Sequence, residues 1–144
     1  MNNKLNYPTW LVPLDIAQEL KAIGFDEKCY FVSTLSEKIG FTSKENYSYY
    51  HFIENVDKCN YNKNEGIFSI PTWTDVFAWF RTRGYKITFK DINIGTQCAF
   101  YHLDIREGHT FSHFAKKYEK AREGLVMKLI EVHKEFGNNI KRFD

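Results

Sequence analysis

The sequence predicts an α+β fold: a small, largely antiparallel sheet of about four strands with three helices, in the order α-β-(β)-β-α-β-β-α. Three observations lead to this prediction. Residues 70–90 contain a helical pattern that runs directly into an alternating strand pattern. Residues 98–105 supply a second strand close enough to pair with it as a hairpin. Residues 111–136 repeat apolar side chains at helical spacing.

The helix predicted after Pro71 has the most complete local signals in the chain. Thr72 can cap its N-terminus, and Asp75 three residues later completes a capping box near the positive end of the helix dipole. Gly84 supplies a left-handed cap, and the alternation over residues 85–89 predicts a half-buried strand. The apolar side chains of this helix are Trp73, Val76, Phe77, Trp79 and Phe80.

The N-terminal part begins with a polar arm over residues 1–9, followed by an amphipathic helix that Gly24 ends. Residues 29–35 are rich in β-forming side chains and predict a strand. The helix and its glycine repeat the spacing of the central helix, so that Ile16, Leu20, Gly24 and Phe25 match Val76, Phe80, Gly84 and Tyr85. This spacing fits a duplicated half, but it also fits any two helices that end at glycine.

Residues 36–66 carry the weakest signals. Residues 36–44 are polar, and residues 46–53 fit either a strand or a short helix. The asparagines of residues 57–66 favour a loop or turn, and residues 67–70 read as a short strand before the central helix.

The C-terminal part continues with a turn at residues 91–95 and the hairpin strand 98–105. The longest helix is predicted to begin at Phe111, with an apolar stripe of Phe111, Phe114, Tyr118, Ala121, Leu125, Leu129, Val132 and Phe136. Gly124 costs this helix about 1 kcal/mol relative to alanine, which indicates either close packing or local weakness. Gly137 ends the helix, and residues 138–144 form a tail.

Composition predicts one globular domain over residues 1–144, located in the cytoplasm. No apolar run approaches the roughly 20 residues that span a bilayer. The net charge of +2 does not by itself indicate a polyanionic partner. The three cysteines, Cys29, Cys59 and Cys98, are expected to be reduced thiols. The aromatic share of 17% is high, so some rings are expected to line a surface or cleft.

The first candidate site is a group of cationic and aromatic residues at the end of the central helix: Trp79, Arg81, Arg83 and Tyr85. Arginine forks bind phosphate or carboxylate, and an aromatic ring beside them can stack on a base. In the alternative interpretation, the arginines complement the negative end of the helix dipole while the rings fill the core.

A second candidate surface combines four neighbouring residues, Tyr47, Tyr49, Tyr50 and His51. Too many rings stand together there for all of them to point inward, which favours a partner surface.

Signatures of catalysis are absent, and we expect neither an enzyme nor a cofactor. The sequence has no nucleophile elbow, no phosphate-binding glycine loop and no local signature of a catalytic thiol. The weak metal candidates are His109 and His113, which would share one face if the last helix began early enough, with Asp104 or Glu107 as a third ligand. Alternatively, both are polar residues at the start of that helix.

Three segments carry a resemblance to a known group. They are Val12-Pro-Leu-Asp-Ile-Ala-Gln-Glu-Leu-Lys-Ala-Ile-Gly-Phe25, Ile70-Pro-Thr-Trp-Thr-Asp-Val-Phe-Ala-Trp-Phe-Arg81 and Tyr118-Glu-Lys-Ala-Arg-Glu-Gly-Leu-Val-Met-Lys-Leu-Ile130. About a third of the chain thus resembles uncharacterised small proteins that tailed bacteriophages and prophages of gut anaerobes encode. The resemblance implies a setting of host takeover or counter-defence in the host cytoplasm, and it supplies no catalytic residues.

The leading hypothesis is a non-enzymatic phage-type binding module that sequesters a host component, either a host protein or an anionic small ligand such as a nucleotide signal. The alternative is a nucleic-acid-binding accessory protein that uses Lys86, Lys90, Lys116, Lys117 and Lys120. A metal-dependent enzyme around His109 and His113 is the third class. Pairing of two copies through the last helix is also open, and no membrane partner is expected.

Overall fold

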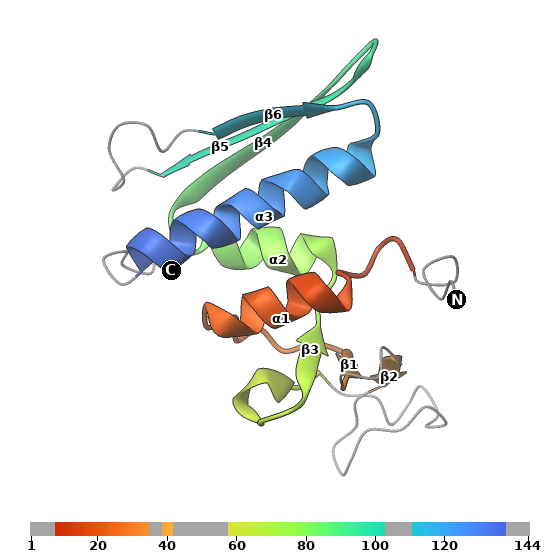
Figure 1. Ribbon diagram of the computed structural model, residues 1–144, viewed down its shortest axis with the longest axis vertical. Coiled ribbons are helices and arrows are strands. Elements are labelled where there is room, and N and C mark those ends of the chain that lie inside the picture. The colour runs from red at the N-terminus through yellow and green to blue at the C-terminus, as the bar shows by residue number, and fades with distance from the viewer. Residues whose placement is uncertain (1–7, 35–38, 42–57, 103–110, 138–144) are drawn as a thin grey trace. The chain divides into compact units, whose positions relative to one another are not determined.

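The computed structural model describes residues 8–34, 39–41, 58–102 and 111–137 (Figure 1). The predicted α+β class and antiparallel pairing are confirmed, and the strands form two three-stranded sheets. The chain divides into two compact units, residues 1–76 and residues 77–144, within helix α2 (Trp73–Arg81). The predicted tail 138–144 and most of the predicted arm 1–9 lie outside the described residues.

The described residues of the first unit before α2 form a helix, a short 3₁₀ turn and three short strands. These are α1 (Leu14–Ala22), β1 (Phe31–Ser33), β2 (Ile39–Phe41), η3 (Tyr61–Lys63) and β3 (Phe68–Ile70). β1 lies in the middle of the sheet and pairs antiparallel with both neighbours, in the order β2-β1-β3. β2 falls in the segment that the sequence indicated only as polar, because its pairing depends on a partner strand rather than on its own composition.

Hydrogen bonds to backbone carbonyls join distant segments of the first unit. The amide of Val12 donates to the carbonyl of Pro71 over 3.0 Å, and the indole of Trp73 donates to the carbonyl of Thr9 over 2.9 Å. The ammonium of Lys21 donates to the carbonyl of Ile67 over 2.7 Å. These contacts hold α1 and the start of the chain against the segment that leads into α2.

The second unit contains a sheet with one long helix on it. Its elements after α2 are β4 (Tyr85–Ile92), β5 (Gly95–His102), β6 (Phe111–Ala115) and α3 (Tyr118–Phe136). The predicted hairpin is confirmed, with β4 and β5 paired from Tyr85 opposite His102 to Ile92 opposite Gly95. β6 adds to β5, so the order is β4-β5-β6, and Figure 1 shows α3 along one face of this sheet.

The prediction of a helix from Phe111 is wrong for its first turns. Residues 111–115 form strand β6, and the helix begins at Tyr118. Phe111 and Phe114 are three residues apart, which also suits a helix, but in the strand they point to opposite faces. Phe111 packs against Phe100 with ring centroids 5.6 Å apart, while Phe114 is exposed. From Tyr118 onward the predicted stripe largely holds, and its buried members are Ala121, Leu125, Leu129 and Val132.

Gly124 occupies the point where α3 crosses His113 of β6. A Cβ at this glycine would lie 2.7 Å from His113 Nε2, well inside van der Waals contact. Of the two interpretations that the sequence left open, the structure favours close packing.

We expect Gly124→Ala to lower the free energy of unfolding by about 0–2 kcal/mol in total, because the new methyl group displaces the His113 ring at a cost of about 1–3 kcal/mol. This cost opposes the roughly 1 kcal/mol that alanine gains in helix propensity. Urea unfolding measures the change. In a His113→Ala background the same substitution should stabilise the protein, and stabilisation in the wild-type background would contradict the prediction.

Candidate nucleic-acid interface

The rings of the first candidate site are core residues. Trp79 is 1% exposed and Tyr85 is 0% exposed. Both make edge contacts with Phe80, at centroid distances of 5.1 and 5.3 Å. Because their faces are covered by neighbouring side chains, neither ring is placed to stack on an external ligand.

The two arginines of the same site bond to backbone carbonyls. The guanidinium carbon of Arg83 lies 3.6 Å from the Trp79 ring centroid, and its Nη1 donates to the carbonyl of Trp79 over 3.2 Å. Nη2 of Arg81 donates to the carbonyl of Ile87 over 3.2 Å, which sets this exposed side chain beside β4. The contacts of Arg83 support the interpretation in which the rings fill the core and a cation satisfies the last carbonyls of the helix.

We expect Arg83→Ala to lower the free energy of unfolding by about 1–2 kcal/mol, through loss of the stacking on Trp79 and of a carbonyl partner. The exposed Arg81→Ala should cost less, within about 0.5 kcal/mol. Thermal and urea unfolding of the two variants provide a matched comparison. Equal stability of both variants and the wild type would contradict this assignment.

Behind these residues is a polar cluster that the sequence did not reveal. The hydroxyl of Tyr85 and Nδ1 of His133 are 3.0 Å apart, and Nε2 of His102 is 2.6 Å from the carbonyl of Arg83. Burial raises the pKa of Tyr85. Burial, together with the charges of Arg83 and His102, lowers the pKa of His133 to about 4. A neutral imidazole and a neutral phenol therefore face each other at neutral pH. The one sequence feature that pointed to this cluster is the alternation in β5, which places His102 on the same inward face as Phe100.

This pKa makes stability depend on pH in a defined window. An unfolded histidine titrates near pH 6.5, whereas folded His133 titrates near 4, so between these values the unfolded chain binds more protons. We therefore expect stability to fall as the pH falls through this window. In His133→Asn, which cannot titrate, the dependence should be shallower. Urea midpoints across the window measure it, and parallel curves for the two proteins would contradict the prediction.

The metal candidates do not form the predicted pair on a helix. His113 lies in β6 with its ring stacked on Phe111 at 5.8 Å, because the helix begins only at Tyr118. His109 lies outside the described residues, as do Asp104 and Glu107. Within the described ranges, no group of three or more metal-ligating side chains comes together. The second candidate surface, Tyr47, Tyr49, Tyr50 and His51, also lies outside the described residues.

The face of the second sheet that points away from α3 carries a different group of residues, which we call the open face. Side chains alternate along each strand, so one set packs toward α3 and the other toward solvent. The solvent-facing set contains two lysines and two aromatic rings but no carboxylate. Its members are Lys86, Thr88, Lys90, Gln97, Ala99, Tyr101, Ser112 and Phe114.

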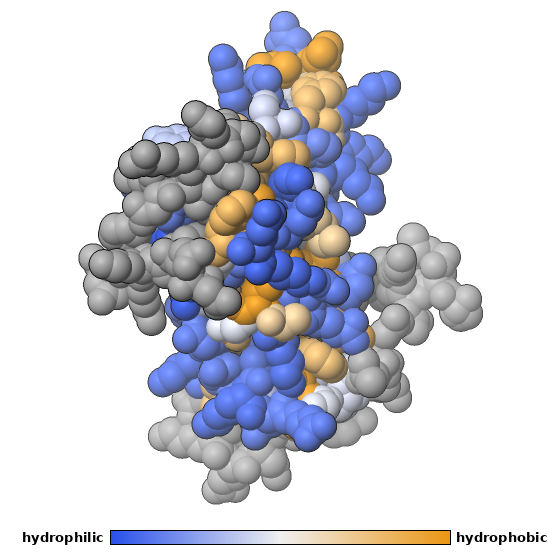
Figure 2. All heavy atoms as spheres, turned by 60° about the vertical axis from the view of Figure 1, so that its left-hand side comes forward, coloured by the Kyte–Doolittle hydropathy of each residue, from blue (hydrophilic) through white to orange (hydrophobic). Residues whose placement is uncertain are grey.

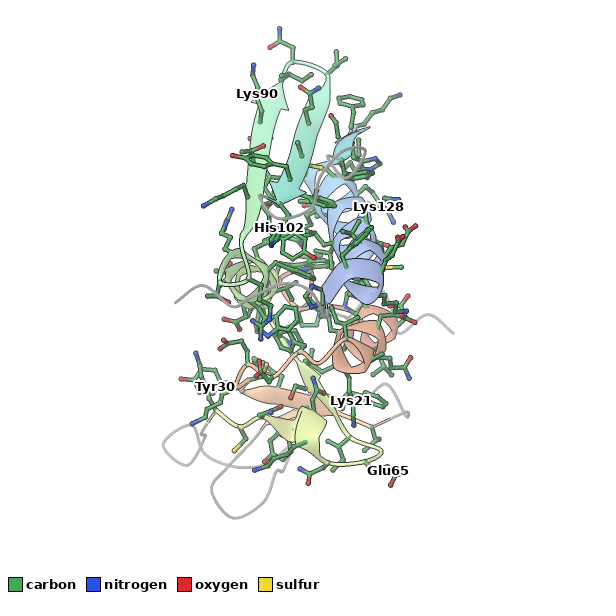
Figure 3. The ribbon with its side chains drawn as sticks, turned by 90° about the vertical axis from the view of Figure 1, so that its left-hand side faces the viewer. Lys21, Tyr30, Glu65, Lys90, His102 and Lys128 are labelled. Atoms are coloured by element: carbon green, nitrogen blue, oxygen red, sulfur yellow. The ribbon has the colours of Figure 1, made fainter. Side chains whose placement is uncertain are left out.

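Strand register arranges the open face in three rows. Lys86 lies opposite Tyr101 in the first row. The third row runs from Lys90 through Gln97 to Phe114. Small or polar side chains fill the middle row, which contains Thr88, Ala99 and Ser112. Tyr101 is 47% exposed and Phe114 is 41% exposed, so each lysine shares a row with a ring that is open to solvent. Figure 3 shows Lys90 on the side of the hairpin opposite α3, which carries Lys128.

More cations lie around the start of α3, and one of them adjoins the sheet. Lys116 and Lys117 are exposed between β6 and α3. Lys116 adjoins the start of β5, because a Cβ on Gly95 would lie 2.9 Å from the Cα of Lys116. Lys120 is exposed as well, but it pairs with Glu123 at 3.7 Å. The lysines proposed from sequence thus divide into two on the open face and three near the start of α3.

The tip of the β4–β5 hairpin carries two isoleucines beside the exposed polar residues Asp91 and Asn93. Ile92 and Ile94 are exposed there, with Ile94 at 72%. Figure 2 shows hydrophobic atoms among hydrophilic ones at this upper end of the second unit. Exposed isoleucines therefore lie beyond the third row of the open face, in a tip that also contains the exposed carboxylate of Asp91.

Charge is distributed unequally between the two units. Residues 77–144 contain 13 lysines and arginines against 8 acidic residues, which gives a formal charge of +5. Residues 1–76 contain 7 against 10, which gives −3. The net charge of +2 therefore conceals a basic unit and an acidic one.

Comparison with known proteins identifies no relative of this chain. No protein-family model matches it, and neither the curated proteins nor the solved structures contain a significant match. None of the helices in the described ranges combines the length and apolar character that crossing a bilayer requires.

Proposed function

We propose that this protein is a non-enzymatic module that binds single-stranded nucleic acid on the open face. The observation that carries the proposal is the pairing, in register, of an exposed ring with a lysine in two separate rows of a face whose described members include no carboxylate. Aromatic rings stack on bases of any sequence, and lysines neutralise the phosphates between them.

The geometry favours a single strand over a duplex. Tyr101 and Phe114 lie in rows four residues apart, which corresponds to about 13 Å along the strands. Successive bases in a helical strand are only about 3.4 Å apart, so the two rings suit bases of an extended strand that are separated by at least one nucleotide. In a duplex the bases are already stacked on each other, and the two rings would meet only sugar and phosphate.

The proposal narrows the hypothesis drawn from the phage resemblance. If the protein sequesters a host component, as that setting suggests, the component would be a single-stranded nucleic acid rather than a protein or a free nucleotide. The basic second unit supports this choice, because a polyanion gains from many separate cations while a small ligand needs a closed pocket.

We expect Tyr101→Ala and Phe114→Ala each to weaken binding of a fluorescein-labelled single-stranded oligonucleotide by about 5- to 100-fold, because each removes a stacked base. Fluorescence anisotropy at low salt measures the affinity. Tyr30→Ala is the matched control, because Tyr30 is an exposed ring of the first unit with the ammonium of Lys58 5.1 Å from its centroid. Equal losses in all three variants, or no binding by the wild type, would contradict the proposal.

The contribution of the lysines should appear in how strongly the binding affinity depends on salt concentration. For a single strand, each phosphate contact contributes about 0.7 to the slope of log affinity against log salt concentration. Lys86→Gln and Lys90→Gln are each expected to reduce the slope by about this amount. Lys128→Gln on α3 should leave it unchanged. If neither Lys86→Gln nor Lys90→Gln changed the slope, the phosphates would not contact these two lysines.

A further inference from the structure

Two cysteines of the first unit face each other across an isolated antiparallel bridge. Cys29 and Cys59 exchange both backbone hydrogen bonds, with N···O distances of 2.9 and 3.0 Å. Residues paired in this way have Cα atoms about 5.5 Å apart, within the range that disulfides span, and their side chains lie on the same face. Both are thiols here. We propose that Cys29 and Cys59 form a reversible dithiol–disulfide site, oxidised by a low-molecular-weight disulfide such as oxidised glutathione.

The two thiols differ in accessibility, which assigns them different roles. Cys59 is partly exposed, whereas Cys29 is 1% exposed and its Sγ lies 3.5 Å from the carbonyl of Glu27. Burial, with smaller contributions from Asp75 and Glu27, raises the pKa of Cys29 to about 12. Because the thiolate is the reactive form, Cys59 reacts first with the oxidant. Cys29 is the resolving cysteine, which then attacks the mixed disulfide on Cys59.

The exchange then proceeds in two steps. The Cys59 thiolate attacks one sulfur of the small disulfide, whose S–S bond breaks to release one small thiol and leave a mixed disulfide on Cys59. Cys29 loses its proton and attacks the Cys59 sulfur, which expels the second small thiol. Two protein thiols lose two electrons in total, and the small disulfide gains them. The two protons end on the released thiols.

Strand geometry makes the bond easy to reverse. Directly opposed residues in a hydrogen-bonded pair have Cβ atoms near the upper end of about 4.5–5.5 Å, whereas a disulfide brings them to about 3.8 Å. Closure must therefore draw the two segments together by about 1 Å or more. Strained disulfides are more readily reduced than relaxed ones. The site is thus suited to exchange with a thiol pool rather than to permanent cross-linking.

Cys98 of the second unit provides an internal control. In its sheet it lies opposite Phe89 on one side and His113 on the other. It is buried, and its Sγ lies 3.4 Å from the carbonyl of Ala121. No cysteine stands across from it, so it has no resolving partner in its register.

The test equilibrates the full chain in glutathione buffers from reducing to oxidising, followed by acid quenching, alkylation in denaturant and peptide mass mapping. We expect a monomeric species that lacks two hydrogens, with Cys29 and Cys59 joined and Cys98 alkylated, and full reversal by dithiothreitol. Cys29→Ser should stop at a glutathione adduct on Cys59, and Cys98→Ser should behave like the wild type.

Three results would overturn the proposal. They are alkylation of all three thiols at every redox ratio, a stable glutathione adduct on Cys59 of the wild type, and a disulfide that joins other cysteines or two chains. The wild-type peptide map tests the proposal by itself, even if a serine variant fails to fold. Because nucleic-acid binding plays no part in this experiment, its outcome is independent of the function proposed above.

Discussion

The packing of α3 against one face of the β4-β5-β6 sheet determines what the rest of the second unit can do. Apolar side chains of the strands, such as Ile87 and Phe100, are buried, and α3 contacts β5 and β6. Gly124 brings the helix close to β6. Strand residues alternate strictly, so this packing forces the remaining set outward as the open face. A register shift of one residue would bury its lysines and expose Phe100.

The aromatic surplus also follows from this packing. Trp79 near the end of α2 and Tyr85 at the start of β4 fill the space that α3 and the sheet enclose, and both rings are fully buried. Rings at outward positions of β5 and β6 have no such space to fill. Tyr101 and Phe114 therefore remain exposed. Composition predicted that some aromatic rings would lie outside the core, and exposed rings are present. They lie on β5 and β6 rather than at the end of the central helix, where they were expected.

Local signals in the sequence predicted the parts of the fold that depend on neighbouring residues. The hydroxyl of Thr72 accepts the amide of Asp75 over 3.1 Å, and Gly84 adopts a φ of 91° at the end of α2, as the capping pattern indicated. β2 and β6 escaped prediction because a short strand is defined by the strand it joins. The open face was not predicted either, because its third row includes Phe114, which the sequence assigned to a helix. The Tyr85–His133 contact could not be predicted, because 48 residues separate its members and only tertiary packing joins them.

The two units carry net charges of opposite sign, so the second unit can attract a polyanion although the net charge of the whole chain is small. A polyanion is attracted by the positive charge of the second unit and repelled by the negative charge of the first. Exposed charges act over about 8 Å at physiological salt, so the local sign near the open face matters more than the sum over the chain. In the proposed function, electrostatics would orient a nucleic acid toward the second unit and the rings would retain it. The thiol–disulfide exchange proposed for the acidic first unit would be separate from this binding, because the approach of a small disulfide to Cys59 involves no polyanion.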